Sequence, residues 1–314
     1  MAKTKEQLLN ILDQFQLDEK VVSAEPFGNG HINDTLKVTN EKGEIKYVLQ
    51  RINHLIFTNV DMLQNNIHVV TTHIRKKLEE KGETDIDRKV LTFLPTKYYF
   101  DGDSYWRVCL FIPRSKSYEE VTPELSYEAG KAFGDFQTML SDIPEGTLGE
   151  TIPDFHNMEF RLRQFHEAVA ANPAGRLEEV KDLVEEIEKR AEAMCIQERL
   201  YREGQLKKRT NHCDTKVNNM MFDADSDKVL CVIDLDTVMP GFVLSDIGDF
   251  IRTGANTGAE DDENLDNVNV NMEIFKAYTR GYMEKAKAFL TPTEIKLLPY
   301  GGRLLTYMQT VRFL

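Results

Sequence analysis

Two short stretches decide the fold of this chain: NHCDTKVNN, residues 211–219, and LCVIDLD, residues 230–236. The first sets Asp214 and Asn219 behind a histidine in the pattern HxDxxxxN. The second begins as a short apolar run, which is typical of a buried strand, and ends on Asp234. The residues between the two stretches predict a hairpin. A loop that carries an acid and an amide is therefore followed, one hairpin later, by a second acid.

The spacing of His212, Asp214 and Asn219 is that of the protein-kinase catalytic loop. An aspartate at the head of such a loop can accept the proton of an attacking hydroxyl. The asparagine can offer its carbonyl oxygen to a magnesium ion on the nucleotide phosphates. Asp234 lies where a kinase places its second magnesium ligand. The alternative interpretation is structural: Asp214 would cap a turn and Asp234 would end a strand.

A glycine-containing segment near the N-terminus, FGNGHIN at residues 27–33, lies between two predicted strands. Gly28 and Gly30 would let backbone N–H groups approach phosphates closely. The segment is not a Rossmann fingerprint, because Asn33 takes the last glycine position and a strand follows. It is not a Walker A loop either, since GK[ST] is absent. A plain glycine turn in a hairpin is the alternative.

The third predicted strand ends on Arg51, and a kinase needs a cation there to pair with the nucleotide phosphates. Strand alternation puts Tyr47, Leu49 and Arg51 on one face, so Arg51 can fill the role that usually belongs to lysine. A surface arginine at a strand end is the alternative. The helix predicted at 60–80 has no glutamate in its early turns, so the Lys–Glu pair of protein kinases is not recovered.

The chain divides into a sheet-rich first third and a helix-rich remainder, with the junction near 111–118. Antiparallel strands and helices are expected in the following places: strands at 21–24, 35–38, 45–49, 89–94, 97–101 and 105–112, and helices at 4–17, 60–80, 124–141, 158–171, 176–203 and from about 267 onward. The predicted fold is α+β and protein-kinase-like. It has a small antiparallel-sheet N-lobe, residues 1–112, and a larger, mainly helical C-lobe, residues 113–314.

Composition narrows the class of partner. The 314 residues favour about two domains. A net charge of −13, from 39 basic and 52 acidic residues, argues against nucleic-acid or anionic-membrane partners bound through bulk charge. No cysteine lies in a CxxC pair or at zinc-ligand spacing, which favours free thiols in a reducing cytosol. No signal peptide or membrane-spanning apolar stretch is found, so a soluble cytoplasmic protein is expected.

Taken together, four motifs closely resemble the N-acetylhexosamine 1-kinases, members of the aminoglycoside phosphotransferase and choline kinase superfamily. These motifs are GNGHIND (28–34), VLQRIN (48–53), HCDTKVNN (212–219) and IDLDTVMPG (233–241). The stretches ETIPDFHN (150–157) and RFL (312–314) extend the resemblance over nearly the whole chain. HxDxxxxN is shared by the superfamily, whereas GHIND combined with DTKVNN and IDLDTVMPG is more specific to sugar 1-kinases.

The resemblance implies a two-lobed fold that binds ATP and Mg²⁺ and transfers the γ-phosphoryl group to the anomeric 1-hydroxyl of N-acetylglucosamine or N-acetylgalactosamine. Asp214 then resembles the catalytic base that meets the substrate hydroxyl, and Arg312 an arginine near the sugar. Asn219 and Asp234 resemble the magnesium ligands. The nucleotide-contacting set is expected to be Gly28, Gly30, His31, Arg51 and Phe111.

Other acceptors and a non-catalytic role stay open at this stage. An aminoglycoside, choline or another small alcohol would fit the same loop, and a cationic acceptor would be favoured by acidic residues around its pocket, such as the 259–263 stretch. A pseudokinase is the non-enzymatic alternative. The resemblance also implies an acidic, aromatic segment beyond RFL that helps to close the sugar pocket, whereas this sequence stops at Leu314.

Overall fold

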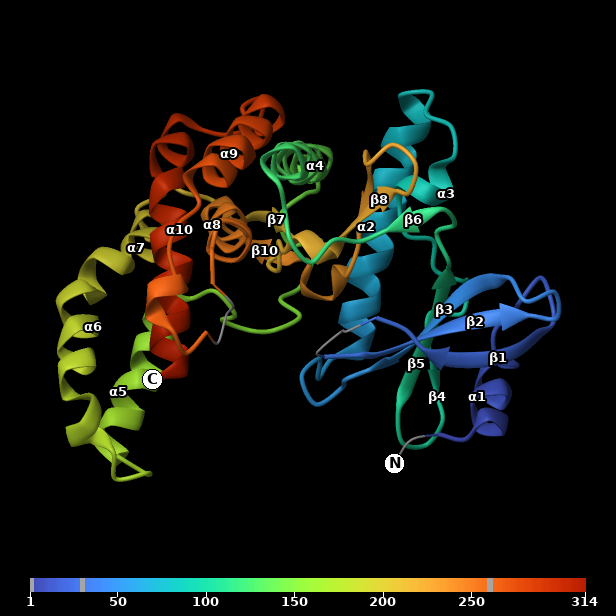
Figure 1. Ribbon diagram of the computed structural model, residues 1–314, viewed down its shortest axis with the longest axis horizontal. Helices are drawn as coiled ribbons and strands as arrows, with labels where there is room; N and C mark the ends of the chain where they lie inside the picture. Colours follow the sequence, from blue (N-terminus) through green and yellow to red (C-terminus); the bar gives the residue numbers. More distant parts are fainter. Residues whose placement is uncertain (1–2, 29–31, 259–261) are drawn as a thin grey trace. The chain divides into compact units, whose positions relative to one another are not determined.

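The computed structural model describes residues 3–28, 32–258 and 262–314 and divides into two compact units (Figure 1). The first comprises Met1–Lys116 with Met221–Asp236, and the second comprises Ser117–Met220 with Thr237–Leu314. The hairpin that follows the predicted catalytic loop thus belongs to the first unit, although it lies far along the chain. The predicted architecture, an antiparallel-sheet N-lobe and a helical C-lobe, is confirmed.

The first unit is built on a five-stranded antiparallel sheet with the order β1-β2-β3-β5-β4. Its strands are β1 (Val21–Pro26), β2 (Asp34–Asn40), β3 (Ile45–Ile52), β4 (Tyr99–Phe100) and β5 (Tyr105–Leu110). The first three form the predicted meander, because their connections are too short for crossover helices. The strand alternation buries one set of side chains under the sheet, Tyr47 and Leu49 among them.

The helix α1 (Lys5–Leu12) covers one face of this sheet. Its buried Leu8, Ile11 and Leu12 pack with Trp106 and other strand residues in one core cluster. A capping box at Thr4 satisfies the N-terminal backbone donors of the helix. The helix ends earlier than the predicted 4–17, since a turn begins after Leu12.

The helix α2 (Val60–Glu80) confirms the 60–80 prediction, with Leu63, Ile67, Val70 and Ile74 buried at helical spacing. Asn59 caps its N-terminus by accepting a hydrogen bond from the Met62 backbone N–H at 3.0 Å.

The strand predicted at 89–94 is wrong. This segment follows the short helix α3 (Ile86–Lys89) and forms only an isolated bridge between Phe93 and Cys109. Its backbone does bond to β5, through Leu94 N to Val108 O at 3.0 Å. The following Pro95 has no N–H to continue a ladder.

A second, three-stranded sheet in the order β6-β8-β9 contains the predicted hairpin. Its strands are β6 (Ser115–Lys116), β8 (Met220–Asp223) and β9 (Val229–Val232). Arg88 fixes the hairpin within the first unit: its guanidinium donates to the Asp223 carboxylate and to the Arg114 carbonyl, each at 2.9 Å.

The second unit is mainly helical. Its long helices are α4 (Pro123–Leu140), α5 (Met158–Ala171), α6 (Lys181–Met194), α7 (Ile196–Arg202), α8 (Val243–Gly254), α9 (Met272–Ala286) and α10 (Pro292–Phe313). A short antiparallel pair, β7 (Arg209–Asn211) and β10 (Met239–Gly241), lies among them. The predicted single helix at 176–203 is instead a 3₁₀ turn, Leu177–Val180, followed by α6 and α7. None of the helices in the described ranges could span a bilayer.

The helix α8 was not predicted from sequence, although its apolar residues, such as Val243, Ile247 and Phe250, recur at helical spacing. All of its first eight residues, Val243–Phe250, are buried, including three polar ones. Other parts of the unit cover its polar residues as well, which distinguishes α8 from a surface helix with a solvent-exposed polar face.

Glycines bring α8 and α10 into close contact. A Cβ on Gly248 would lie 2.2 Å from the Gly301 carbonyl oxygen, and one on Gly301 would lie 2.2 Å from the Leu244 carbonyl oxygen. The atoms in the way are backbone atoms, which cannot rotate aside as a side chain can. These two glycines therefore fix the separation of α8 and α10.

We predict that Gly301→Ala lowers the free energy of unfolding by about 1–3 kcal/mol, because the added methyl group overpacks a backbone contact. Gly302→Ala is the matched control on the next residue of the same helix, where the nearest atom is a side-chain carbon of Ile251 at 3.2 Å. The gain in helix propensity, up to about 1 kcal/mol, offsets much of the free-energy cost of that contact. Urea unfolding of both variants measures the difference, and equal stabilities would contradict the prediction.

Candidate active site

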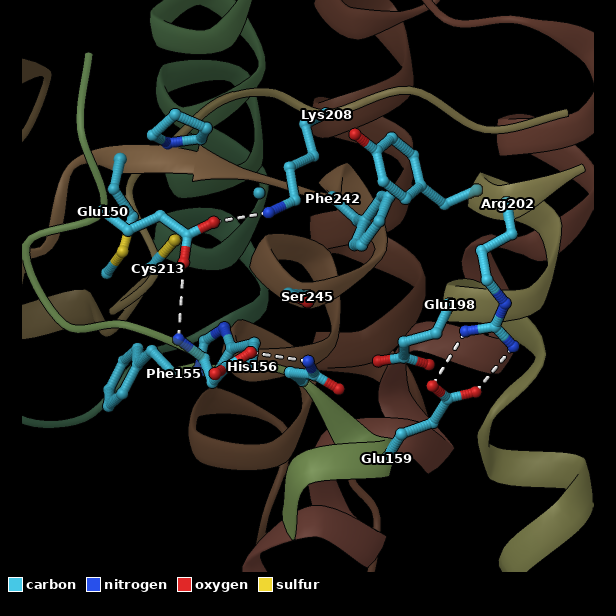
Figure 2. A pocket seen from close by; sticks show the side chains of 16 residues that line it. Glu150, Phe155, His156, Glu159, Glu198, Arg202, Lys208, Cys213, Phe242 and Ser245 are labelled. Carbon is cyan, nitrogen blue, oxygen red and sulfur yellow. Dashed lines mark hydrogen bonds and ion pairs between the residues drawn. The ribbon is translucent and has the colours of Figure 1, made fainter. Parts of the chain in front are cut away.

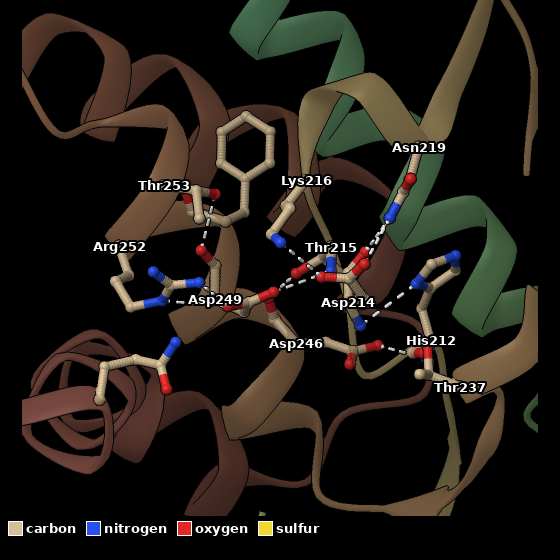
Figure 3. Close-up of polar contacts among 12 residues, drawn as sticks. His212, Asp214, Thr215, Lys216, Asn219, Thr237, Asp246, Asp249, Arg252 and Thr253 are labelled. Carbon is tan, nitrogen blue, oxygen red and sulfur yellow. Dashed lines mark hydrogen bonds and ion pairs between the residues drawn. The ribbon is translucent and has the colours of Figure 1, made fainter. Parts of the chain in front are cut away.

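The HxDxxxxN loop begins where β7 ends and lies in the second unit (Figure 3). His212 is fully buried, and its ring makes edge contacts with Phe133 and Phe136 at centroid distances of 5.7 and 5.9 Å. Its carbonyl accepts a hydrogen bond from the Thr237 hydroxyl at 2.8 Å. Its Nδ1 accepts one from the Asp214 backbone N–H at 3.3 Å. The histidine therefore anchors the loop and does not face the reacting groups.

Two buried carboxylates on α8 hold the backbone of the loop, as Figure 3 shows. Asp246 accepts hydrogen bonds from the backbone N–H groups of His212 at 2.9 Å and Cys213 at 2.8 Å. Asp249 accepts one from the Thr215 N–H at 3.0 Å. Cys213 has a φ of 64°, a left-handed conformation that costs a non-glycine residue about 1–2 kcal/mol. The Asp246 contact offsets this strain, because it binds the N–H of the strained residue itself.

Burial sets the pKa values of these two carboxyls. Burial raises the pKa of Asp246, and the nearby His212 and its hydrogen-bond donors oppose that shift. Burial likewise raises the pKa of Asp249 to about 6, and Arg252, which donates to it at 3.0 Å, opposes the shift. Neither aspartate was among the site residues predicted from sequence. A pair of acids three residues apart in an apolar run is the signal that could have revealed them.

Asp214 is held in place but accessible. Its side chain is 29% exposed, and its Oδ1 lies 3.4 Å from the Lys216 ammonium. The Asn219 amide nitrogen donates to the Asp214 backbone oxygen at 2.8 Å and to its Oδ2 at 2.9 Å. The structure thus brings the predicted base and the predicted metal ligand together. Because the nitrogen of the Asn219 amide bonds to Asp214, the amide oxygen is the end that can ligate magnesium.

Asp234 follows β9 and belongs to the first unit. Its φ of 55° is left-handed, which sharply turns the chain after the strand. Its carboxylate is a hard oxygen donor of the kind that Mg²⁺ prefers. The donor chemistry of Asp234 and Asn219 therefore fits magnesium, and their joint role on one ion stays a prediction.

The residues predicted to contact the nucleotide lie in the first unit. Gly28 has a φ of 78°, and no described heavy atom lies within 4 Å of a Cβ built on it. Phe111 makes an edge contact with Phe27, next to this glycine, at a centroid distance of 6.0 Å. Gly30 and His31 lie outside the described residues.

Arg51 forms an ion pair across the sheet. Its Nε donates to the Asp34 carboxylate on β2 at 2.6 Å, and 44% of its side chain is exposed. Tyr47 and Leu49, predicted to share its face, are buried. The role of Arg51 toward phosphates stays a prediction.

Arg312 lies beside a half-buried histidine. Its guanidinium lies over the Phe155 ring at 5.8 Å, and this ring stacks on His156 at 4.5 Å. Burial and the positive charge of Arg312 lower the pKa of His156 to about 3, with Arg161 and Arg252 adding to the shift and Asp214 opposing it. Two predicted residues, Asp214 and Arg312, thus act on the same imidazole. His156 itself was quoted in a sequence motif but given no role.

A cavity of about 190 Å³ adjoins this group within the second unit (Figure 2). Its wall is formed by the 150–159 segment, α7, β10, the start of α8 and Cys213. Four of its charged side chains are paired: Lys208 contacts Glu150, and Arg202 forms two 2.8 Å hydrogen bonds with Glu159.

A further acid in this wall, Glu198, is buried. Burial raises the pKa of Glu198, whose Oε1 accepts a hydrogen bond from the Met158 backbone N–H at 2.8 Å. Its Oε2 and the Ser245 hydroxyl have no hydrogen-bond partner among the residues that the structure describes. Polar atoms left unpaired in a cavity wall are suited to bind a ligand.

A kinase-like fold with this loop defines a phosphotransferase. Residues 23–282 match the model of the phosphotransferase enzyme family, so the chain belongs to that family. The expected membership of the aminoglycoside phosphotransferase superfamily is confirmed at this level. The protein is therefore an ATP-dependent phosphotransferase that acts on a hydroxyl acceptor.

Two solved structures illustrate the likeness in fold. The chain is 14% identical to the spectinomycin phosphotransferase APH(9)-Ia in complex with ADP and spectinomycin, with a TM-score of 0.56 over 100% of this chain and 94% of that one. It is 12% identical to aminoglycoside phosphotransferase APH(3'')-Id from Streptomyces rimosus in complex with ADP and streptomycin, with a TM-score of 0.51 over 99% of each chain.

The shifted pKa of His156 predicts acid-sensitive folding. Between pH 3 and 6.5 the unfolded chain binds a proton at this imidazole that the folded protein does not. The contribution to stability is therefore fully present above pH 6.5 and is lost as the pH falls toward 3. The slope that His156 adds is at most about 1.4 kcal/mol per pH unit.

We predict that His156→Gln unfolds with a shallower pH dependence than the wild type between about pH 4 and 6.5. Denaturant unfolding at several pH values measures this slope. His68→Gln, at an exposed position of α2, is the control. Parallel curves for wild type and His156→Gln would contradict the prediction.

Proposed function

We propose that this protein transfers the γ-phosphoryl group of ATP to the anomeric 1-hydroxyl of an N-acetylhexosamine, N-acetylglucosamine or N-acetylgalactosamine. The observation that carries the proposal is the surroundings of Asp214: an accessible carboxylate beside a group of arginines, Arg312 included, that act on His156. The motifs shared with sugar 1-kinases support the same acceptor.

The electrostatics of the second unit favour a neutral acceptor over a cationic one. Burial and, after it, three arginines lower the pKa of His156 while Asp214 opposes the shift, which means that a positive charge is disfavoured at this position. In the adjoining cavity Glu150 and Glu159 already have basic partners, and burial raises the pKa of Glu198, which favours its uncharged form. An aminoglycoside or choline would bring a further cation to this region. A neutral sugar brings hydroxyl groups instead, which both donate and accept hydrogen bonds.

In the proposed reaction Asp214 orients the 1-hydroxyl and accepts its proton as the oxygen attacks the γ-phosphorus. Asn219 maintains the orientation of the Asp214 carboxylate through its two hydrogen bonds. Arg312 would bind near the sugar. Positioning and charge stabilisation, rather than covalent chemistry, supply most of the rate acceleration in phosphoryl transfer.

The first unit would bind the nucleotide. Gly28, Gly30 and His31 would lie along the phosphates, Arg51 would pair with them and Phe111 would contact the nucleotide. Magnesium, when bound, neutralises phosphate charge. Asn219 and Asp234 are the residues proposed to hold it, through one amide oxygen and one carboxylate.

We predict that Asp214→Asn lowers kcat by about 10²–10⁴-fold with N-acetylglucosamine, because the amide keeps the shape but cannot accept the proton. ADP release in a coupled assay measures the rate. Asp225→Asn, at an exposed turn residue between β8 and β9, controls for loss of an acid as such. Activity of Asp214→Asn within a few-fold of wild type would refute the role of Asp214.

A panel of acceptors tests the identity of the substrate. We predict higher kcat/KM for N-acetylglucosamine or N-acetylgalactosamine than for choline or an aminoglycoside, and no turnover of the methyl glycoside, whose 1-oxygen is blocked. Arg312→Gln should lower kcat/KM for the sugar, whereas Arg303→Gln, exposed on the same helix α10, should not. A preference for the cationic acceptors would overturn the proposed acceptor.

A further inference from the structure

A buried ionic cluster in the first unit has no part in the roles proposed so far. It consists of Asn33, Arg107 and Asp236, here called the Arg107 cluster. Arg107 and Asp236 are each only 2% exposed, and the Arg107 guanidinium lies 2.6 Å from the Asp236 Oδ1. The other carboxylate oxygen of Asp236, Oδ2, accepts a hydrogen bond from the Asn33 amide at 2.5 Å. Both oxygens of the buried acid are therefore engaged.

Arg107 connects the sheet to α2. Its Nε donates to the Gln50 side-chain oxygen on β3 at 2.9 Å. With the Gln64 amide in the orientation that satisfies both of its ends, the Gln64 oxygen accepts from the Arg107 guanidinium at 3.1 Å. Protein kinases join sheet and helix through a Lys–Glu pair, which the sequence of α2 does not provide. In this chain an arginine on β5 and a glutamine on α2 make the connection.

Asn33 connects two functional segments. Its side-chain oxygen accepts a hydrogen bond from the Asn53 backbone N–H at 2.9 Å, at the end of β3, while its amide nitrogen donates to Asp236. Asn33 follows the glycine segment that contains Gly28, and Asp236 is two residues beyond Asp234. One short side chain therefore joins the predicted phosphate-binding segment to the predicted metal-binding segment.

Charge and burial decide what Asp236 can do. A buried carboxylate is stable only when paired, and removing one partner leaves an uncompensated charge. Asp236 has an arginine against one oxygen and an amide on the other, so an added cation would have to compete with the Arg107 guanidinium for the same buried carboxylate. Although its spacing from Asp234 would let it serve as a second metal ligand, its contacts oppose that role.

We infer that Asn33, Arg107 and Asp236 are positioning residues that hold the Gly28 and Asp234 segments in the arrangement that binds magnesium–ATP, and that Asp236 is not itself a metal ligand. This inference rests on the proposed nucleotide and metal roles of the first unit. It does not depend on the acceptor.

The test measures nucleotide binding, without any acceptor or turnover. Calorimetry with a non-hydrolysable ATP analogue gives Kd in Mg²⁺ and in EDTA for wild type, Asn33→Ala and Arg107→Lys. We expect wild type to bind the analogue more tightly in Mg²⁺ than in EDTA. In both variants, the ratio of the Kd in EDTA to the Kd in Mg²⁺ should be about tenfold smaller than in wild type. Lysine keeps the charge of Arg107 but not its planar fork of donors.

Asn40→Ala is the matched control. Asn40 is a buried asparagine of β2, and both ends of its side-chain amide form hydrogen bonds, as those of Asn33 do. It should lower the melting temperature without changing the Mg²⁺ enhancement. A purely structural role for the Arg107 cluster would make Asn33→Ala behave like this control and would overturn the inference.

Asp236→Asn separates positioning from metal binding. We expect it to lose the same fraction of the Mg²⁺ enhancement as Asn33→Ala, and the double variant to lose no more than either single one, because both changes break one connection. Complete loss in Asp236→Asn with normal enhancement in Asn33→Ala and Arg107→Lys would instead make Asp236 a ligand and overturn the inference. Failure of the proposed acceptor would leave these binding results unchanged.

Discussion

The carboxylate of Asp246 is the contact on which the active-site loop depends. It is 1% exposed and accepts hydrogen bonds from two consecutive backbone N–H groups, those of His212 and Cys213, and from the Gln137 side chain at 2.7 Å. Without it, two buried N–H groups would lack a partner next to a residue in a left-handed conformation. Because Asp246 holds the two residues before Asp214, it helps to set the direction in which the Asp214 side chain points.

The position of Asp246 is in turn fixed by how α8 packs. The backbone contacts at Gly248 and Gly301 leave no room for a Cβ at either position, so the position of α8 against α10 is tightly constrained. Asp246 and Asp249, one turn apart, then accept hydrogen bonds from the Cys213 and Thr215 N–H groups of the loop. A chain of contacts thus runs from helix packing, through buried acids, to the part-exposed Asp214.

What sequence can predict here is what is local in the chain. The spacing of Asp214 and Asn219 is realised within one loop, and Asp234 follows its strand as expected. Helices with regularly spaced apolar residues, such as α2, could also be predicted. The irregular segment at 89–94 was misjudged, because an apolar run shows burial but does not show whether its backbone can continue a ladder.

Contacts between distant segments could not be predicted from one sequence. Arg107 and Asp236 are separated by more than a hundred residues, and each alone resembles an ordinary charged residue near a strand. Burial sorts the aspartates into two kinds: Asp236 and Asp246 are only 2% and 1% exposed, whereas Asp214, although its oxygens also contact protein groups, is 29% exposed. A buried acid can organise a site, but only one that solvent and substrate can reach can exchange a proton with an acceptor. The difference between these acids therefore follows from their burial, which spacing alone does not disclose.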